Sequence, residues 1–383
     1  MNILRSIKKR YISIKKFLIN QDSKTWCFLP YGDDFTGNIK AIFESVRHTT
    51  ITKVIFTKSR SFDKYRSQSV IIINNLDHKY FFRSSILICD QMLDLYHSQM
   101  SLYLERVTIL NVWHGIPIKK MFMASQKPCS PYIGKEKDQF NIIASSKQDA
   151  LAMSECFDLP LNRVHITGLP RIDLLQTTSL DCIQSEQVNL QAILKGKPFI
   201  LFAPTWRQNT NDYYQFSSSE LDHIDRFLKE NDCILGVREH FHQRNSFYYQ
   251  QLEEVGAINV GNTLFKNIET LIKSAILLIT DYSSCHFDFL HLNKPSISFA
   301  FDYERYKFQE RGFLYEIEEV FNNNVFFNFH DVISQCKAIM VDQKVSNQHQ
   351  SDLKNKFFLY NDNNNTKRTL TLIENLINEK LKI

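Results

Sequence analysis

From Lys24 onward, the sequence alternates short β-rich apolar runs with stretches long enough for helices. Continuous apolar strands separated by helical segments are typical of parallel sheets covered on both faces. One series of runs precedes a polar stretch at about 176–187, and a second series follows it. The pattern therefore predicts an α/β fold of two doubly wound domains with a central cleft between them. The runs are Trp26–Leu29, Lys53–Thr57, Val70–Ile73, Ile86–Cys89, Val107–Val112, Phe140–Ala144, Val164–Thr167, Phe199–Ala203, Ile234–Val237, Ala257–Val260, Ile276–Thr280 and Ile297–Ala300.

The length of 383 residues also fits two domains. We expect a basic segment over 1–22, a first domain over 23–185 and a second domain over 186–383. In the C-terminal part, an Asn-rich turn at 361–365 precedes a predicted closing helix, Leu370–Leu381. Eight cysteines without any C-x-x-C pair favour reduced thiols in a cytosolic protein over a disulfide framework or a structural zinc site.

The net charge of +5 is concentrated at the N-terminus, where residues 1–20 hold six Lys and Arg and no acid. The rest of the chain is close to neutral, which argues against nucleic acid as a partner. Within this segment, apolar residues recur at helical spacing, and no apolar run reaches the ~18 residues of a membrane span. The helix is expected either to lie on an anionic membrane surface or to pack on the body with its lysines in water. Its apolar face consists of Ile3, Leu4, Ile7, Tyr11, Ile14 and Leu18.

Chemically useful residues follow several predicted strands, at the sheet edge where open α/β folds bind ligands. His114, which can exchange a proton near neutral pH, follows one strand in the context Trp-His-Gly-x-Pro-x-Lys. Arg171 follows another and is expected either to bind an anion or to pair with Asp173. Arg238 and His240 share a face of an extended backbone. His242 lies close by, but a metal pair there lacks a local third ligand, so we predict no metal site.

The strongest local signal is the apolar strand Ile276–Thr280, which runs into Asp281-Tyr282-Ser283-Ser284 and a predicted helix, Cys285–Leu292. Asp281, Ser283 or Ser284 can cap that helix, and its free N–H groups suit a phosphate or pyrophosphate. An ordinary capped helix explains the same residues. The absence of a glycine-rich phosphate loop weakens an NTPase or NAD reading.

Taken in order, these motifs resemble the CDP-glycerol glycerophosphotransferases of teichoic-acid synthesis, over about residues 30–315. Asn38-Ile39-Lys40, after Gly32, is similar to an N-terminal element of that family. Two departures stand out: the family's Arg-x-His-Pro is Arg238-Glu239-His240-Phe241 here, and Asn322–Asn324 lies where a Pro-Gly element is usual. The motifs are Trp113–Lys119, Thr167–Asp173, Ala203–Arg207, Arg238–His240 and Ile279–Ser284, continued by Phe287–Phe289, Lys294-Pro295, Asp302, Tyr306 and Arg311-Gly312.

The resemblance implies a GT-B fold, in which two Rossmann-like domains face a cleft and the second binds the nucleotide. It implies transfer of glycerol phosphate from CDP-glycerol to a hydroxyl of a lipid-linked or capsular, teichoic-type glycan, with release of CMP. It further implies a cytoplasmic enzyme, peripheral on the inner face of the membrane, without an obligatory cofactor or metal.

By the same resemblance, His114 is the general base on the attacking hydroxyl and His240 donates a hydrogen bond to the pyrophosphate. The remaining assignments fall into two groups. Donor and phosphate binding is assigned to Thr205, Arg207, Arg238, Asp281, Ser283 and Ser284. Acceptor binding or support of the loops is assigned to Asn38, Lys40, Gly115, Lys119, Arg171 and Asp173.

Three alternatives stay open on the sequence. The donor could be CDP-ribitol or another CDP-polyol, with fold and phosphate site unchanged. A GT-B glycosyltransferase would move a sugar from a nucleotide sugar instead. A non-catalytic glycan-binding or scaffold protein is the third, and the presence of both His114 and His240 argues against it.

Overall fold

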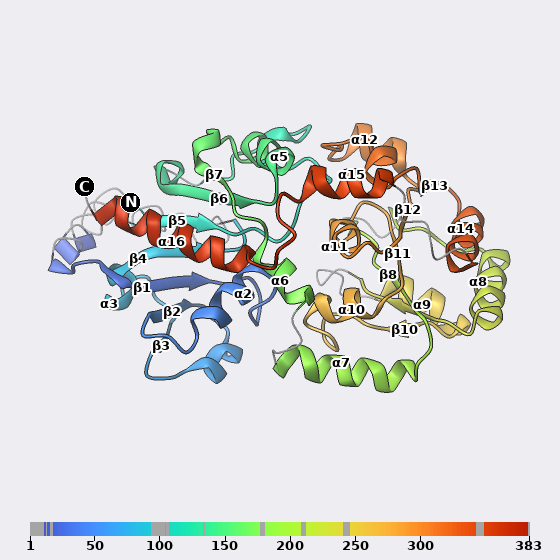
Figure 1. Cartoon of the computed structure of the whole chain (residues 1–383), viewed down its shortest axis with the longest axis horizontal. Coiled ribbons are helices and arrows are strands. Elements are labelled where there is room, and N and C mark those ends of the chain that lie inside the picture. The colour runs from blue at the N-terminus through green and yellow to red at the C-terminus, as the bar shows by residue number, and fades with distance from the viewer. Residues whose placement is uncertain are drawn as a thin grey trace, which may run out of the picture. The chain divides into compact units, whose positions relative to one another are not determined.

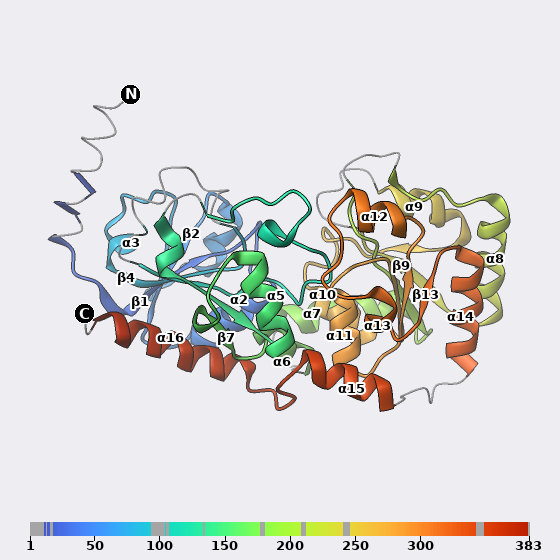
Figure 2. The ribbon, with the colours of Figure 1, turned by 90° about the horizontal axis from the view of Figure 1, so that it is seen from above.

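The computed structural model describes residues 11, 12, 14, 15, 18–92, 104, 107–132, 135–176, 181–207, 212–239, 246–341 and 348–381. The chain forms two compact units, each built around its own parallel sheet (Figures 1 and 2). Unit 1 takes in residues up to His114, Met121–Asp173 and Leu359–Ile383. Unit 2 takes in Gly115–Lys120 and Leu174–Phe358.

Unit 1 has a seven-stranded sheet in the order β3-β2-β1-β4-β5-β6-β7. Its central strand β4 is buried at every position, as expected for an apolar run covered on both faces. The C-terminal helix α16 packs against α2, β4 and β5. The strands are β1 (Asp22–Leu29), β2 (Thr52–Phe56), β3 (Val70–Ile73), β4 (Ser84–Cys89), β5 (Thr108–Asn111), β6 (Phe140–Ala144) and β7 (Val164–Ile166). The helices are α2 (Gly37–Val46), η1 (Arg60–Tyr65), α3 (Lys79–Arg83), η3 (Phe122–Ala124), η4 (Lys135–Gln139), α5 (Lys147–Phe157), η5 (Leu161–Arg163), α16 (Asn365–Leu381) and the start of α6 (Pro170–Gln176).

Unit 2 has a six-stranded sheet in the order β10-β9-β8-β11-β12-β13. Its core joins side chains of β8, β9, β11 and β12 to those of α8 and α14. The strands are β8 (Phe199–Phe202), β9 (Ile234–Val237), β10 (Ile258–Asn259), β11 (Leu277–Thr280), β12 (Ser296–Phe299) and β13 (Val325–Phe326). The helices are α7 (Asp181–Leu194), α8 (Ser218–Glu230), α9 (Phe247–Leu252), η7 (Glu253–Val255), α10 (Ile268–Ser274), α11 (Cys285–His291), α12 (Tyr303–Gln309), α13 (Ile317–Val320), α14 (Phe329–Val341) and α15 (Gln348–Phe357).

Every predicted apolar run forms a strand, and β3, β6 and β9 have the predicted bounds. The predicted domain bounds of 23–185 and 186–383 need two corrections. The polar stretch at 176–187 is largely occupied by α7, which belongs entirely to unit 2. The predicted closing helix exists as α16, but it belongs to unit 1 rather than to the second domain.

Both sheets reverse their strand order at one internal point, between β1 and β4 in unit 1 and between β8 and β11 in unit 2. Strands on the two sides of such a point send their following loops in opposite directions, which opens a crevice at the carboxyl edge. The segments after β1, β4, β8 and β11 are therefore where each unit is expected to bind a ligand.

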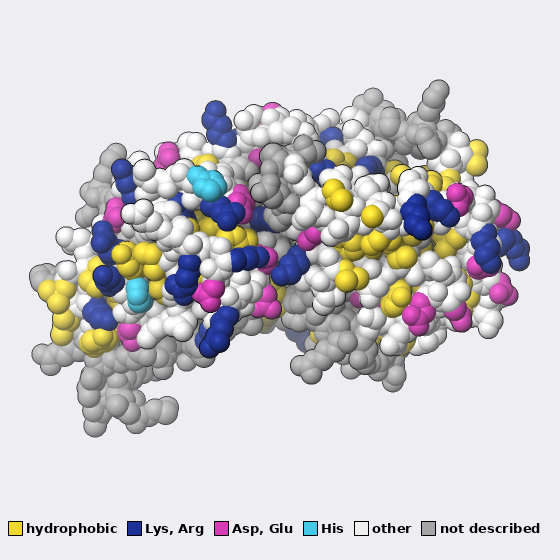
Figure 3. All heavy atoms as spheres, turned by 90° about the horizontal axis from the view of Figure 1, so that it is seen from below, with side chains coloured by type: hydrophobic (Ala, Val, Ile, Leu, Met, Phe, Trp, Pro, Cys, Tyr) yellow, Lys and Arg dark blue, Asp and Glu magenta, His cyan; other side chains and the backbone are white. Residues whose placement is uncertain are grey.

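The predicted N-terminal helix lies only partly within the described residues; Ile3, Leu4 and Ile7 lie outside them. Ile12 is buried, whereas Tyr11, Ile14 and Leu18 of the predicted apolar face are 46%, 53% and 70% exposed. In the described part of the chain, no helix has the length and apolar character needed to cross a membrane. On the face drawn in Figure 3, Lys and Arg side chains are interspersed with Asp and Glu.

Candidate functional site

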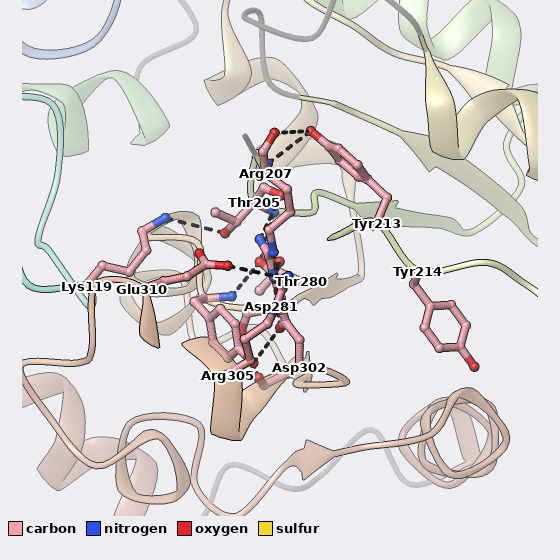
Figure 4. A network of polar contacts seen from close by, with 12 residues as sticks. Lys119, Thr205, Arg207, Tyr213, Tyr214, Thr280, Asp281, Asp302, Arg305 and Glu310 are labelled. Carbon is pink, nitrogen blue, oxygen red and sulfur yellow. Dashed lines mark hydrogen bonds and ion pairs between the residues drawn. The ribbon is translucent and has the colours of Figure 1, made fainter. Parts of the chain in front are cut away.

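The strand reversal of unit 2 is organised by Asp281, the first residue after β11. Its Oδ1 accepts hydrogen bonds from the backbone N–H of Thr205, at 2.9 Å, and of Tyr282. Its Oδ2 lies 2.9 Å from Nη2 of Arg207. One carboxylate thus ties the segment after β8 to the segment after β11 (Figure 4).

Arg207 is almost fully buried, and protein acceptors occupy its guanidinium. Nε and Nη2 donate to the two carboxylate oxygens of Asp302 at 3.0 and 3.1 Å, and Nη1 donates to the Thr205 carbonyl at 3.0 Å. The rings of Tyr282 and Tyr306 lie 5.6 and 5.0 Å from the guanidinium carbon. This geometry corrects the predicted phosphate contact of Arg207: the side chain positions the two carboxylates instead.

The charges of this network shift each other's pKa. Burial alone would raise the pKa of Asp281, but Arg207 and the Thr205 hydrogen bond outweigh it and hold the pKa below its ordinary value. Burial would lower the pKa of Arg207, and Asp281 and Asp302 together raise it. The network continues outward through Arg305, which contacts Asp302 at 2.9 Å and also Asp212 and Glu310.

A cavity of about 130 Å³ lies at the same edge, lined in part by Arg238, Glu239, Ser283 and Cys285. Nη1 of Arg238 donates to the carbonyls of Val260 and Phe265 at 3.0 and 2.7 Å, and its Nη2 donates to Asn262. Burial lowers the pKa of Arg238 to about 10. Two predicted donor residues, Arg238 and Ser283, therefore do meet at one cavity of unit 2.

Glu239, which the sequence did not single out, lines the same cavity. Its Oε1 accepts a hydrogen bond from the backbone N–H of Tyr248, at 2.8 Å, at the start of α9. Burial raises the pKa of its carboxyl to about 7. His240, the next residue and a predicted pyrophosphate contact, lies outside the described residues.

Of the three predicted capping residues, Ser283 is the one whose side chain contacts a backbone N–H at the start of the helix after β11. Its Oγ accepts from the backbone N–H of Cys285 at 3.5 Å. Ser284 is the N-cap residue by position, and its side chain makes no capping hydrogen bond. Asp281 is engaged with Thr205 and Tyr282 instead. The helix, α11, is seven residues long and ends at His291 rather than Leu292.

Lys119 belongs to unit 2, although the sequence assigned it to acceptor binding or loop support. The segment Gly115–Lys120 pairs with the chain after α12: Leu314 N–H donates to the Ile118 carbonyl at 2.9 Å, and Lys119 forms an antiparallel bridge with Phe313. Nζ of Lys119 donates to Oγ1 of Thr205 at 3.4 Å (Figure 4). Burial lowers the pKa of this ammonium to about 8. Gly115 is buried in the same segment.

In unit 1, His114 is an exposed side chain on the loop after β5. Its Nδ1 lies 3.4 Å from the Asp90 carbonyl oxygen, and the Trp113 ring packs against the imidazole with centroids 4.2 Å apart. A carbonyl can only accept, so a neutral His114 in this contact carries its hydrogen on Nδ1. The lone pair is then on Nε2, the atom a general base would use.

Asn38 and Arg171 hold the backbone of that loop. Nδ2 of Asn38 donates to the carbonyls of Val112 and Trp113 at 2.7 and 3.1 Å. Nη1 of Arg171 donates to the His114 carbonyl at 2.7 Å, and its backbone N–H donates to Asn38 Oδ1. The loop needs this support because Trp113 has a φ of 44°, a left-handed conformation that is unfavourable for a bulky residue. Both residues are therefore loop supports.

Asp173 and Lys40 lie on helices of unit 1, α6 and α2. The Asp173 carboxylate accepts from the backbone N–H groups of Asn365 and Thr366, at 3.3 and 2.7 Å, so it caps the start of α16. Lys40 is buried on α2. In the described residues, no group of three or more His, Cys, Asp or Glu is arranged to hold a metal ion.

The family model described as CDP-Glycerol:Poly(glycerophosphate) glycerophosphotransferase matches residues 11–375. The chain belongs to this family. It is 27% identical over 305 residues to the teichoic acid poly(glycerol phosphate) polymerase of Bacillus subtilis (strain 168), covering 75% of this chain and 40% of that protein. It is 25% identical over 363 residues to the teichoic acid glycerol-phosphate primase of the same strain, covering 90% of each.

The teichoic acid poly(ribitol-phosphate) polymerase of Bacillus spizizenii is equally similar, at 27% identity, with 74% of this chain and 46% of that protein covered. The chain thus spans less than half the length of the two polymerases. Among solved structures, the wall teichoic acid polymerase TagF superposes with a TM-score of 0.75 at 20% identity, covering 99% of this chain and 97% of that one. This likeness confirms the predicted GT-B fold of two Rossmann-like domains.

Asp90, which the sequence analysis did not single out, occupies in unit 1 the position that Asp281 occupies in unit 2. It follows β4 directly and is buried, and its Oδ1 accepts from the backbone N–H of Tyr31 at 3.0 Å. Burial raises the pKa of the carboxyl to about 7. The sequence pattern could have identified Asp90, because an acidic residue directly after an apolar strand is the same pattern that drew attention to Asp281.

Proposed function

We propose that this chain transfers glycerol phosphate from CDP-glycerol to a hydroxyl of a lipid-linked or capsular, teichoic-type glycan and releases CMP. The observation that carries the proposal is the match of the glycerophosphotransferase family over residues 11–375, nearly the whole chain. The family's description names CDP-glycerol as the donor and poly(glycerophosphate) as the acceptor. The cavity at the strand reversal of unit 2, with Arg238 and Ser283 in its wall, supports donor binding by this unit.

In the proposed reaction, the acceptor hydroxyl oxygen attacks the phosphorus that carries glycerol. The bond from that phosphorus to the oxygen bridging it to CMP breaks, and CMP leaves with the electron pair. The hydroxyl proton passes to Nε2 of His114. Phosphoryl transfer of this kind depends mainly on positioning and on neutralising the charge that develops on the phosphate oxygens.

His114 is proposed as the general base because its contact with the Asp90 carbonyl fixes the tautomer that leaves a lone pair on Nε2. The supports from Asn38 and Arg171 favour a fixed position for the loop that carries it. Ser283 and Ser284 are proposed donor contacts at the start of α11. His240 keeps the role that the family resemblance implies, as a hydrogen-bond donor to the pyrophosphate.

The alternative donor is CDP-ribitol. The equal identity, 27%, to a poly(glycerol phosphate) polymerase and to a poly(ribitol-phosphate) polymerase favours keeping it as the second candidate. Fold and phosphate site would be the same for both donors, since the two differ only in the polyol.

The direct test incubates the purified chain with CDP-glycerol, CDP-ribitol, UDP-glucose and UDP-N-acetylglucosamine, together with a teichoic-type acceptor, and identifies the released nucleotide. CMP from CDP-glycerol supports the proposal, and CMP from CDP-ribitol alone moves it to the second candidate. Release of UDP from a sugar donor identifies a glycosyltransferase. Absence of any release with all four donors contradicts the proposed activity.

We also propose that this enzyme works at the cytoplasmic face of the membrane and contacts anionic lipid through residues 1–20. Tyr11, Ile14 and Leu18 lie at helical spacing and are exposed, while six cations fall in the same segment. Exposed apolar side chains next to cations are typical of a helix that binds an anionic bilayer surface.

The test for this surface is flotation with phosphatidylglycerol-containing vesicles at low and high salt. The variant Tyr11→Ser with Ile14→Ser and Leu18→Ser is expected to lose most of its binding. Leu161→Ser, at an exposed leucine elsewhere in unit 1, is the matched control and should bind like the parent. Equal binding of the triple variant and the control would contradict the lipid contact.

A further inference from the structure

The donor diphosphate needs a positive partner in unit 2, and the two arginines predicted for that task are already engaged. Arg207 is held by Asp281, Asp302 and the Thr205 carbonyl. Arg238 donates to two backbone carbonyls and to Asn262. Arg305, the remaining cation of the network, contacts three carboxylates. Carboxylates therefore balance the charges of Arg207 and Arg305, whereas Arg238 keeps its charge but has both Nη groups bonded to neutral acceptors of the protein.

Lys119 makes far fewer contacts than these arginines. In the described part of the chain, the contact of its ammonium is a single long hydrogen bond, 3.4 Å, to Thr205 Oγ1. An ammonium has three N–H donors, so two are not used by these residues. Removing such a group from water without full pairing is unfavourable, and an arriving anion would repay that desolvation.

From this geometry we propose that Lys119 is a donor-binding residue, whose ammonium contacts a diphosphate oxygen of the nucleotide bound at the strand reversal of unit 2. The inference rests on the proposed function, because it takes a CDP-linked donor as the ligand. It moves Lys119 from the acceptor side, where the sequence motif alone put it, to the donor side. Thr205 directly follows Pro204, which lines the cavity, and Cys285, also in the cavity wall, interacts electrostatically with the Lys119 ammonium, so the ammonium lies close to that cavity.

The position of Lys119 along the chain gives this contact a second consequence. Residues 115–120 are built into unit 2 through their pairing with residues 312–314, and His114 directly precedes them. Lys119, which would hold a donor phosphate, is therefore only five positions along the chain from His114, the proposed general base. Donor binding is expected to restrict this segment and, with it, the backbone that leads to His114.

The charge state of Lys119 gives the test its sharpest readout. Burial lowers its pKa to about 8; the groups facing it are Asp281, which raises the pKa, and Arg311 and Arg207, which lower it, with Cys285 beside them. The ammonium, and so the diphosphate contact, is present below pH 8 and is lost as the pH rises through that value. Arginine stays protonated across this range, so a Lys119→Arg variant should lose the pH dependence.

The experiment measures binding of CDP and of cytidine by calorimetry at pH 7.0 and 9.5. The variants are Lys119→Met, Lys119→Arg and, as the matched control, Lys120→Met at the neighbouring lysine; thermal unfolding checks that each is folded. Lys119→Met is expected to weaken CDP binding at pH 7.0 by at least about tenfold, the effect of losing one charge-assisted hydrogen bond. It should leave cytidine binding unchanged, and Lys119→Arg should restore CDP binding at both pH values.

Two results would overturn the inference: CDP binding by Lys119→Met within twofold of the parent, or an equal loss for CDP and cytidine. The parent chain separates this failure from failure of the proposed function. If the parent binds CDP and turns over CDP-glycerol while Lys119→Met is unaffected, only the role of Lys119 is wrong. If the parent neither binds CDP nor turns over CDP-glycerol, the proposed function fails and the inference with it.

Discussion

The two units carry an aspartate at the same topological position, with opposite electrostatic results. Asp90 follows β4 and Asp281 follows β11, each the strand beside the first strand of its sheet. Each carboxylate accepts a hydrogen bond from a backbone N–H just after that first strand, from Tyr31 at 3.0 Å and from Thr205 at 2.9 Å. In each unit, the doubly wound topology therefore places an aspartate whose carboxylate bonds across the strand reversal. We call Asp90 and Asp281 the bracket aspartates.

What differs is the neighbouring cation. Arg207 beside Asp281 overcomes the effect of burial and holds the pKa of that carboxyl below its ordinary value. Burial of Asp90 raises its pKa to about 7, because the hydrogen bond from Tyr31 is too little to oppose it. Topology thus fixes where a carboxyl lies, and one side chain decides whether the position holds a permanent charge or a proton that exchanges near neutral pH.

The largest expected effect tests whether the edge of unit 1 handles a proton. His114→Ala should lower kcat for glycerol phosphate transfer by about 10²–10⁴-fold, the usual contribution of a positioned base, while CDP binding stays unchanged. His48→Ala, at an exposed histidine of the same unit, is the control. Turnover of His114→Ala close to that of the control would show that the base lies elsewhere.

The next effect tests whether unit 2 depends on its buried cation. Arg207→Met removes the ion pair of buried Asp281 and leaves buried Asp302 with Arg305 as its one cationic contact among the described residues, so the free energy of unfolding should fall by about 3–5 kcal/mol. Arg66→Met removes an exposed pair with Asp63 and should change it by no more than about 1 kcal/mol. Similar urea midpoints for the two variants would contradict the positioning role of Arg207.

Substituting each bracket aspartate by asparagine sharpens the comparison, because the two changes should have opposite signs. The raised pKa of Asp90 means that its contribution to stability is full below about pH 4 and is lost as the pH rises through 7. Asp90→Asn should therefore stabilise the protein at pH 8, by on the order of 2 kcal/mol, and by a smaller amount at pH 5, where part of that contribution is still present.

The lowered pKa of Asp281 has the reverse consequence: its contribution is present above pH 4 and is lost only in acid. Asp281→Asn should destabilise the protein at both pH 5 and pH 8, by on the order of 2 kcal/mol. Urea unfolding of both variants at the two pH values, with exposed Asp63→Asn as the reference, is the measurement. Changes of the same sign at pH 8 would remove the electrostatic distinction between the two units.

The parts of this fold that could be predicted from sequence are those with a local signal. Strands buried on both faces are apolar throughout, so each long run was recognisable. β13 was not predicted because it has only two residues, both half-buried, after an Asn-rich turn. α7 was not predicted because its buried residues, Ile183, Leu190 and Leu194, are separated by many polar residues.

The site residues also divide into those with a local sequence signal and those without one. His114 and Asp281 were singled out because each lies within three residues of the end of a strand. The occupation of Arg207 was not predictable, because its partner Asp302 lies 95 residues further along the chain. The assignment of α16 to unit 1 also depends on a distant contact, since Asp173 caps a helix that begins 192 residues later. Neither pairing leaves a trace in local spacing or composition.

The smallest expected effect tests how the exposed base of unit 1 is held. Asn38→Ala removes the two hydrogen bonds to the Val112 and Trp113 carbonyls, so the loop can leave its left-handed conformation at Trp113. We expect kcat to fall by roughly tenfold, at an unchanged KM for CDP-glycerol, and the free energy of unfolding to fall by about 1–3 kcal/mol. Asn141→Ala is the matched control, because this buried asparagine of β6 also bonds two carbonyls, those of Ile109 and Gln139. It should show the stability loss with kcat retained; an equal loss of kcat in both variants would mean that Asn38 supports the unit as a whole and not the position of His114.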